Sequence, residues 1–156
     1  MVKGGPNNYQ KWWNFTVADN GDIYFASNAE EGFGRTDIYY SRIVNGKYLP
    51  RENPGLNINS KGMDVNPYIA PDSSFLLFAS DKEGGLGGLD IYVSWRQENG
   101  EWGEAENLGP GVNSDEQDGT PIISHDGKYL FFGSFTSGNR DNYWIDVASV
   151  AALIRP

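Results

Sequence analysis

The chain has no cysteine and only one histidine, His125, among its 156 residues. Without cysteine it can form neither disulfide bonds nor thiolate metal sites. A single histidine also leaves no Ser-His-Asp set and no histidine-rich metal cluster to assemble around it. We therefore expect no catalytic residues, no metal site and no cofactor in these residues.

Long apolar runs are missing as well, so from these residues we expect no membrane insertion and no signal peptide. Basic residues are few: 12 Lys and Arg stand against 21 Asp and Glu, giving a net charge of −9. An acidic chain is a poor match for the phosphate backbone, so we expect no nucleic-acid partner. The acidity favours either a cationic partner or divalent ion, or simply solubility.

What the chain does have is an internal repeat of about 53 residues. Segments 16–27, 69–80 and 123–134 each place a turn acid before an apolar strand, and these acids are Asp19, Asp72 and Asp126. A second marker follows in the first two copies, where Asp37 and Asp90 both precede Ile-Tyr. A repeat of this period indicates one supersecondary unit stacked on itself.

Each copy divides into short strands separated by turn signals. In the second copy a nearly all-apolar stretch, 75–80, predicts a strand covered on both faces. Asn99-Gly100 is a strong hairpin signal and predicts a further outer strand over 101–105. Four antiparallel strands in a unit of this length are typical of a β-propeller blade.

The sequence therefore predicts an all-β fold in a single domain, 1–156. We expect three β-propeller blades, each a four-stranded antiparallel sheet, at about 14–54, 66–106 and 120–147. The last blade is incomplete because 148–154 favours a short C-terminal helix within a tail, 148–156. Residues 1–8 align with 108–115, so we also expect the chain to start just after a preceding blade.

The segment from Asp72 to Asp81, followed by Asp90-Ile-Tyr, resembles the TolB-like (WD-like) β-propeller repeat. The linker that begins Asn107-Leu-Gly and ends Asn113-Ser resembles the connection between blades in a bacterial branch of that family. The resemblance implies a six-bladed ring, of which this chain is the C-terminal half or a half-ring protomer. It also implies a periplasmic or secreted location.

The predicted function is a non-catalytic binding or scaffold module that recognises a protein or a glycan. In propellers, ligands usually dock on the loop-rich face near the central channel. The alternative is part of a hydrolase of glycans or peptides, whose site is completed by a missing half or by a second protomer. Fold alone does not separate these functions.

The channel face is expected to collect the loops 28–36, 81–89 and 136–141 and the starts of the inner strands. Its candidate ligand-binding residues are Asp64, Asp118, Arg35, Arg140, Asp81 and Glu116. Each has a structural alternative. Asp64 and Asp118 could cap backbone amides at a strand start, and the two arginines could pair with Asp37 and Asp141.

Asp37 and Asp90 themselves are predicted to accept hydrogen bonds from the amides of the preceding glycine-rich loop. Trp102 and Trp144 are predicted core residues, and Trp12 and Trp13 could stack on a ligand or pack between blades. Exposed blade faces predict self-association, with a dimer closing a six-bladed ring. A neighbour's segment 7–13 could pair with the open edge of the third blade.

Overall fold

The computed structural model describes residues 12–154, except for the side chains of Trp12, Trp13 and Ser137. The segment 7–13, predicted to pair with the third blade of a neighbour, lies mostly outside this range. It is all-β, as predicted. The strands are β1 (Trp12–Val17), β2 (Ile23–Ser27), β3 (Asp37–Ser41), β4 (Ile43–Val44), β5 (Lys47–Tyr48), β6 (Asp64–Ile69), β7 (Phe75–Ser80), β8 (Asp90–Trp95), β9 (Glu106–Asn107), β10 (Asp118–Ile123), β11 (Tyr129–Ser134) and β12 (Asp141–Asp146). The short 3-10 helices are η2 (Thr136–Gly138), η3 (Val147–Ser149) and η4 (Ala151–Leu153).

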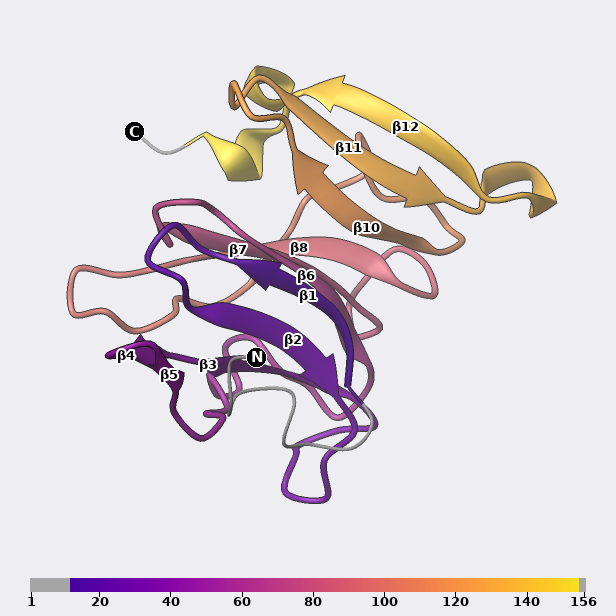
Figure 1. Ribbon diagram of the computed structural model, residues 1–156. Helices are drawn as coiled ribbons and strands as arrows, with labels where there is room; N and C mark the ends of the chain where they lie inside the picture. Colours follow the sequence, from indigo (N-terminus) through magenta and orange to yellow (C-terminus); the bar gives the residue numbers. More distant parts are fainter. Residues whose placement is uncertain (1–11, 155–156) are drawn as a thin grey trace.

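The strands form four antiparallel sheets. Three of them stack on one another, and we call these the first blade (β1-β2-β3), the second blade (β6-β7-β8-β9) and the third blade (β10-β11-β12). Figure 1 shows them one above another, in chain order from indigo to yellow. The inner strands of successive blades, β1, β6 and β10, are neighbours. Within each blade the following strands pair outwards from the inner strand in chain order. This is the arrangement of strands in a β-propeller.

Two apolar cores hold the stack together. Between the first and second blades the core includes Tyr24, Ile69 and Phe78, and between the second and third it includes Leu77 and Leu130. The side chains of β7 alternate between these two cores, because successive residues of a strand point to opposite faces. This explains why the segment 75–80 is almost entirely apolar.

Each blade also carries a stacked Phe–Tyr pair on one face. The ring centroids of Phe25–Tyr39, Phe78–Tyr92 and Phe132–Tyr143 lie 6.2, 6.0 and 5.9 Å apart. Such offset aromatic pairs between neighbouring strands add stability beyond the area they bury. The repetition of this pair makes the three blades equivalent in structure as well as in sequence.

The outer strands differ between blades. The second blade has a fourth strand, but it pairs at β9 rather than over the predicted 101–105, where only an Arg96–Trp102 bridge forms. In the first blade the fourth strand is reduced to one Tyr40–Glu52 bridge, and a separate β4–β5 hairpin projects beside it.

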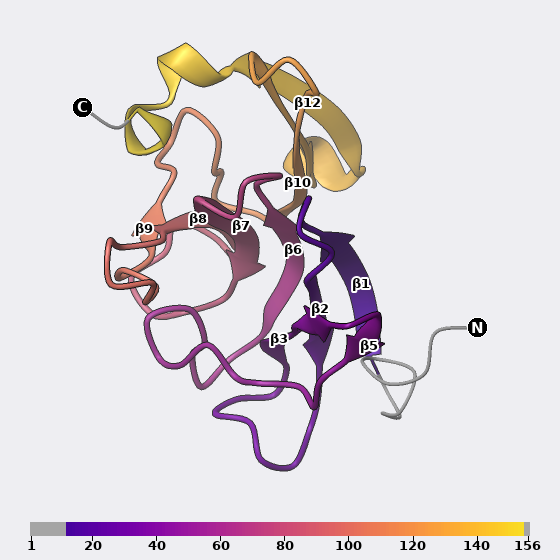
Figure 2. The same ribbon diagram turned by 60° about the vertical axis from the view of Figure 1, so that its left-hand side comes forward.

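The third blade ends at β12, and the predicted short helix is present as the two 3-10 turns η3 and η4. Val150 and Leu153 bury their side chains in the core shared with the second blade. The indole Nε1 of Trp95 donates to the carbonyl oxygen of Ala152 over 3.1 Å. Figure 2 shows this yellow C-terminal segment running over the side of the stack near β8 and β9.

A side-chain amide fastens each linker between blades to the third strand of the preceding blade, which is β8 or β3. Asn113 accepts a hydrogen bond from the Ile91 amide (2.7 Å) and donates one to the Ile91 carbonyl (2.9 Å). Asn59 makes the same two bonds to Ile38, at 2.8 and 2.9 Å. One asparagine side chain thereby replaces a strand partner, which is why the Asn-Ser ending of the linker recurs in this sequence.

Candidate functional site

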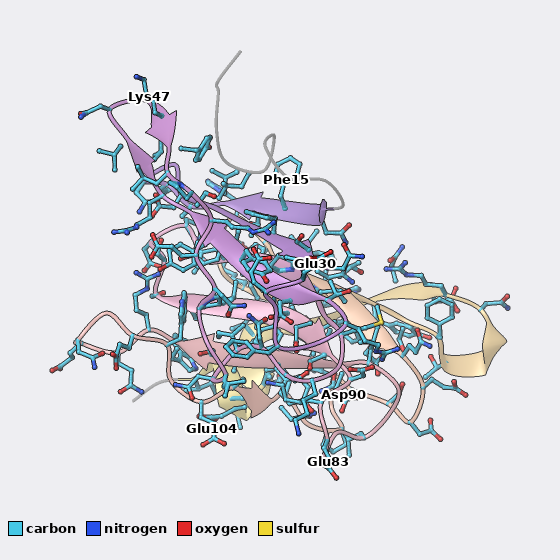
Figure 3. The ribbon with its side chains drawn as sticks, turned by 90° about the horizontal axis from the view of Figure 1, so that it is seen from below. Phe15, Glu30, Lys47, Glu83, Asp90 and Glu104 are labelled. Carbon is cyan, nitrogen blue, oxygen red and sulfur yellow. The ribbon has the colours of Figure 1, made fainter. Side chains whose placement is uncertain are left out.

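The strand ends that were predicted to line the channel face lie together within the second and third blades. In the second blade Asp64, Ser80 and Asp90 are cross-strand partners, so the start of β6, the end of β7 and the start of β8 lie together. Asp118, Ser134 and Asp141 are related in the same way in the third blade. In Figure 3 the labelled side chains Glu30 and Glu83 belong to the loops at this end, whereas Lys47 projects from the distant β4–β5 hairpin.

Asp64 is fully buried and is bonded to the linker that precedes it. Its Oδ2 accepts from the amide and hydroxyl of Ser60 (2.6 and 3.0 Å), and its Oδ1 accepts from the Ser80 hydroxyl (2.6 Å). Burial raises the pKa of Asp64 because desolvation outweighs these hydrogen bonds and the nearby Lys82 charge. This geometry favours the structural alternative, in which Asp64 caps the linker.

Asp118 repeats this arrangement with one difference. Its Oδ2 accepts from the amide and hydroxyl of Ser114, at 2.6 and 2.8 Å. Its Oδ1 and the Ser134 hydroxyl are buried polar atoms without a hydrogen-bond partner among the described residues. Binding of a ligand by Asp64 and Asp118 stays a prediction, and neither carboxylate is exposed at the surface.

Arg35 and Asp81, two other predicted site residues, form an ion pair between the loop of the first blade and that of the second. Asp81 also accepts a 2.6 Å hydrogen bond from the Met63 amide. The alternative Arg35–Asp37 pair is not among the ion pairs of the described residues. Asp37 instead accepts from the amides of Phe33 (2.7 Å) and Gly34 (2.9 Å). The pair leaves the Arg35 side chain largely exposed on the channel face.

Asp90 accepts from the amides of Leu86 and Gly87, as Asp37 does in its own loop. The predicted role of these two acids as acceptors for the glycine-rich loops is therefore confirmed by the hydrogen bonds. The glycines are needed for close approach: a Cβ on Gly87 would lie 2.2 Å from the Glu116 carbonyl oxygen. The Glu116 side chain itself is exposed.

Arg140 donates from Nη2 to the Thr120 hydroxyl over 3.0 Å and lies 5.8 Å from the centre of the Phe135 ring. The predicted alternative, a pair with Asp141, is not among the ion pairs of the described residues. Arg140 is exposed, so its remaining donors face solvent beside the inner strand β10.

Three equivalent bulges on the inner strands form a feature that sequence reasoning missed. Asn14, Asn66 and Thr120 have φ angles of 37°, 53° and 52°, each where the pairing register of β1, β6 or β10 shifts. Asn14 donates a hydrogen bond to the Asn66 side chain. We call these three residues the channel row.

A groove of about 260 Å³ runs along the channel row, with Pro67 and Pro121 also in its lining. Positive φ in residues other than glycine costs about 1–3 kcal/mol and is concentrated at functional sites. The sequence marks two of these positions only as polar residues before proline, Asn66 before Pro67 and Thr120 before Pro121.

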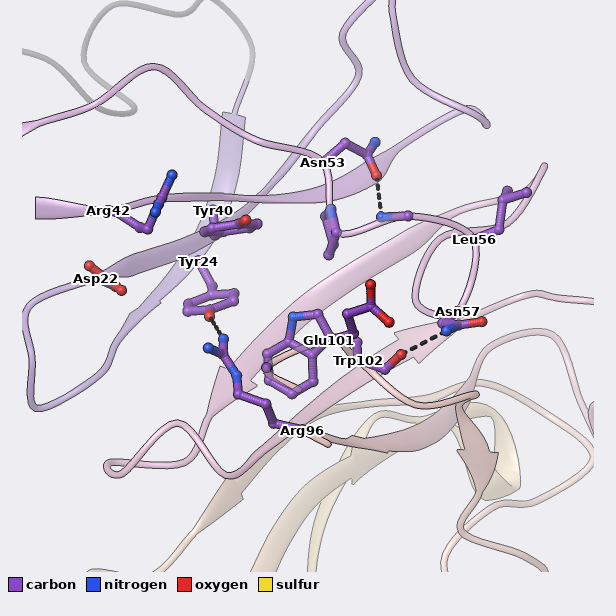
Figure 4. Close-up of a pocket in the computed structure, with 13 residues that line it drawn as sticks. Asp22, Tyr24, Tyr40, Arg42, Asn53, Leu56, Asn57, Arg96, Glu101 and Trp102 are labelled. Carbon is purple, nitrogen blue, oxygen red and sulfur yellow. Dashed lines mark hydrogen bonds between the residues drawn. The ribbon is translucent and has the colours of Figure 1, made fainter. Parts of the chain in front are cut away.

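A second cavity, of about 570 Å³, lies at the outer rim between the first and second blades (Figure 4). Figure 4 shows Tyr24 and Tyr40 stacked on one side, with Trp102 and Arg96 opposite. The Arg96 guanidinium lies 4.6 Å from the centre of the Trp102 ring, and its Nη2 donates to the Tyr24 hydroxyl over 2.7 Å. We call this the rim pocket.

Charge and burial in the rim pocket favour a structural contact between blades. Burial raises the pKa of Tyr24 to about 12, although the nearby Arg96 charge lowers it. Arg42 is held by Glu52, to which its Nε and Nη2 donate over 2.9 and 2.6 Å. Trp102 is buried, as predicted, whereas the prediction that Trp144 is a core residue is wrong, because its side chain on β12 is 65% exposed.

His125 lines a third cavity, also of about 570 Å³, which lies at the turns of the second and third blades, away from the channel face. Within the described residues, no group of three or more His, Asp or Glu side chains is placed to hold a metal ion. No helix in the same part of the chain is long and apolar enough to cross a membrane.

Comparison with solved structures identifies the fold. The chain is similar to TolB from Acinetobacter baumannii (TM-score 0.61, 17% identity), with 90% of this chain and 31% of that chain covered. It is also similar to a putative TolB from Agrobacterium tumefaciens (TM-score 0.61, 16% identity), where 88% of this chain and 46% of that chain are covered. These likenesses show a TolB-like β-propeller fold, as predicted.

A third similar structure is a mutant of puromycin hydrolase in complex with PGG (TM-score 0.55, 13% identity), with 92% of this chain and 22% of that chain covered. The chain thus spans less than half the length of each of these proteins. No family model matches the sequence, and no curated protein matches it.

Proposed function

We propose that this chain is a non-catalytic binding module that holds an extended polypeptide segment on its channel face. The observation that carries the proposal is the channel row, which sets polar side chains from three successive inner strands side by side along a groove. The same polar position recurs on each inner strand. A ligand that lies across the blades would therefore meet a hydrogen-bonding side chain on every inner strand.

The chemistry of the row suits a peptide backbone. A side-chain amide such as that of Asn66 both donates and accepts hydrogen bonds, as does the backbone of an extended peptide. Arg140 adds a cation beside Thr120, and Phe15 adds an exposed ring next to Asn14. A glycan could use some of the same groups, so it is the competing ligand in the experiment.

The state of the acidic residues supports the non-catalytic reading. Glycoside hydrolysis needs two carboxyl groups that reach the substrate. Asp64 and Asp118, which occupy equivalent channel-end positions, are buried and bonded to Ser60 and Ser114. From the resemblance in fold to TolB structures we also propose a periplasmic or secreted location.

The test is selection from a display library of random peptides, followed by titration of the enriched peptides in solution. Binding should weaken at least tenfold in Asn66→Gly, which removes the amide while permitting positive φ, and in Arg140→Ala. Lys47→Ala, on the distant β4–β5 hairpin, is the control and should bind normally. Failure to enrich any peptide, or equal binding by all variants, would overturn the proposal, as would selective binding of an oligosaccharide instead.

A hydrolase remains the second candidate because of the likeness to puromycin hydrolase and the Asp118 Oδ1 atom, which has no partner among the described residues. This candidate predicts turnover of fluorogenic peptide or glycan substrates that is lost in Asp118→Asn. We expect no turnover by the chain as it stands.

A further inference from the structure

The rim pocket is formed entirely by the first two blades and by residues 53–57 of the linker between them. Its volume of about 570 Å³ is within the range of pockets that take small organic molecules, ~300–1,000 Å³. The contact between Arg96 and Tyr24 joins the blades at one wall of this pocket. The residues of the channel row are not part of its lining, so the pocket is a separate candidate site.

The Arg96 guanidinium in this wall is not neutralised by an acid. It forms no ion pair within the described part of the chain, whereas Arg42, the other arginine of the lining, is paired with Glu52. The Nε of Arg96 is buried and has no hydrogen-bond partner among the described residues. The Trp102 ring attracts the cation but carries no net charge. A half-buried guanidinium in this state is suited to bind the carboxylate of a ligand through paired hydrogen bonds.

Two carboxylates of the same lining, Asp22 and Glu101, also have no cationic partner among the described residues. Asp22 accepts hydrogen bonds from the Ile43 amide (2.9 Å) and the Asn20 side chain (3.0 Å). Glu101 accepts from the side chain of Asn99 over 2.9 Å. All of these donors are neutral, so both negative charges remain and would repel a ligand that is purely anionic.

Arg96 and Glu101 both line the pocket, yet the ion pairs of the described residues do not join them. In the view of Figure 4 the Arg96 guanidinium and the Glu101 carboxylate lie on either side of the Trp102 ring. A tight turn holds the backbone of Glu101, whose carbonyl oxygen accepts from the Gln97 amide over 2.8 Å. Opposite charges held apart on the wall of one pocket are complementary to a ligand that carries both signs.

We propose that the rim pocket binds a small zwitterion, namely an α-amino acid with an apolar or aromatic side chain. Its carboxylate binds Arg96, and its ammonium group faces Glu101. Its side chain packs against the apolar part of the lining, to which Leu56 contributes and which includes the Tyr40 ring. One zwitterion satisfies both charges of the pocket, whereas a ligand with a single charge satisfies one and is repelled by the other.

Titration of the isotope-labelled chain with L-phenylalanine, followed by NMR, is the first test. Phenylalanine should bind with a dissociation constant in the millimolar range or tighter, and it should shift the signals of the Trp102 indole N–H and the Glu101 amide. Phenylalaninamide lacks the carboxylate and hydrocinnamate lacks the ammonium group. Each of these two compounds should bind at least tenfold more weakly than phenylalanine, because each loses one charge-assisted contact.

Substitutions at the two charges are the second test. Glu101→Gln should weaken phenylalanine at least tenfold without weakening hydrocinnamate, and Arg96→Gln should weaken phenylalanine without weakening phenylalaninamide. Glu98→Gln is the matched control, because Glu98 is exposed in the same turn and lies outside the lining. Glu101 is also exposed, so this variant tests the proposal even where Arg96→Gln fails to fold. No shift of the pocket signals at millimolar phenylalanine would overturn the proposal, as would equal or tighter binding of either analogue or unchanged binding by Glu101→Gln.

Discussion

Arg96 and Tyr24 join two blades through a single hydrogen bond. Arg96 follows β8 of the second blade, and its Nη2 donates over 2.7 Å to the hydroxyl of Tyr24 in β2 of the first blade. The Tyr24 ring is buried between Tyr40 and Trp102, at centroid distances of 5.5 and 6.2 Å. The contact therefore couples the packing between the blades to the protonation of one phenol.

This coupling predicts a loss of stability at alkaline pH. Burial raises the pKa of Tyr24 from 10.0 to about 12. Between these values the folded chain keeps the phenol proton while the unfolded chain loses it, so the free energy of unfolding falls as pH rises from 10.0 to about 12. Tyr24→Phe should reduce this fall by about 2 kcal/mol, as measured by urea unfolding at each pH. Tyr129→Phe, at an exposed position at the start of β11, is the control and should retain the full slope.

Asn113→Ala should be strongly destabilising. It would leave the buried amide of Ile91 without its partner and would free the linker that this side chain holds, while the Ile91 carbonyl keeps its 3.0 Å hydrogen bond from the Leu108 amide. An unsatisfied buried amide costs about 1–3 kcal/mol, so we expect a loss of about 2 kcal/mol in chemical unfolding. Asn139→Ala, at an exposed position, should change stability by less than about 0.5 kcal/mol. A small effect at Asn113 would contradict its role as a strand partner.

Thr120→Asn should stabilise the fold. Thr120 has a φ of 52°, and a β-branched residue tolerates that region poorly, whereas asparagine tolerates it better and is present at the equivalent positions Asn14 and Asn66. We expect a gain of about 0.5–1 kcal/mol from relieved strain, read as a higher melting temperature. Thr120→Val keeps the branch and removes the hydroxyl that Arg140 contacts. A gain in that variant would show that backbone strain is not the cause.

Asp64→Asn should change how stability depends on acidity. Burial raises the pKa of Asp64 above its ordinary value of 3.8, so the folded chain holds this proton to higher pH than the unfolded chain does. Its contribution to the free energy of unfolding therefore falls as pH rises from 3.8 towards the raised pKa. The advantage of the unsubstituted chain over Asp64→Asn should be larger at the acidic end of a thermal melting series than at neutral pH. Asp115→Asn, at an exposed position, is the matched control, and an identical pH profile for Asp64→Asn and the unsubstituted chain would contradict the assignment.

The sequence alone determined the repeat and therefore the blades. Turn acids such as Asp72, the apolar segment 75–80 and the glycine loop before Asp90 act over a few residues, and local chemistry of this kind can be read without coordinates. The acceptor role of Asp37 and Asp90 was predictable for the same reason, because both partners lie within four residues of the acid.

Only the tertiary structure decided which surfaces are available. Asp64 and Asp118 are buried because each linker folds back onto the strand that follows it, and Arg35 pairs with Asp81 because two loops 46 residues apart meet. The channel row depends on bulges in three strands, and the exposure of Trp144 depends on which side of its blade is covered. These properties follow from contacts between blades. A sequence pattern that repeats in every blade cannot indicate which blade face is covered by a neighbouring blade.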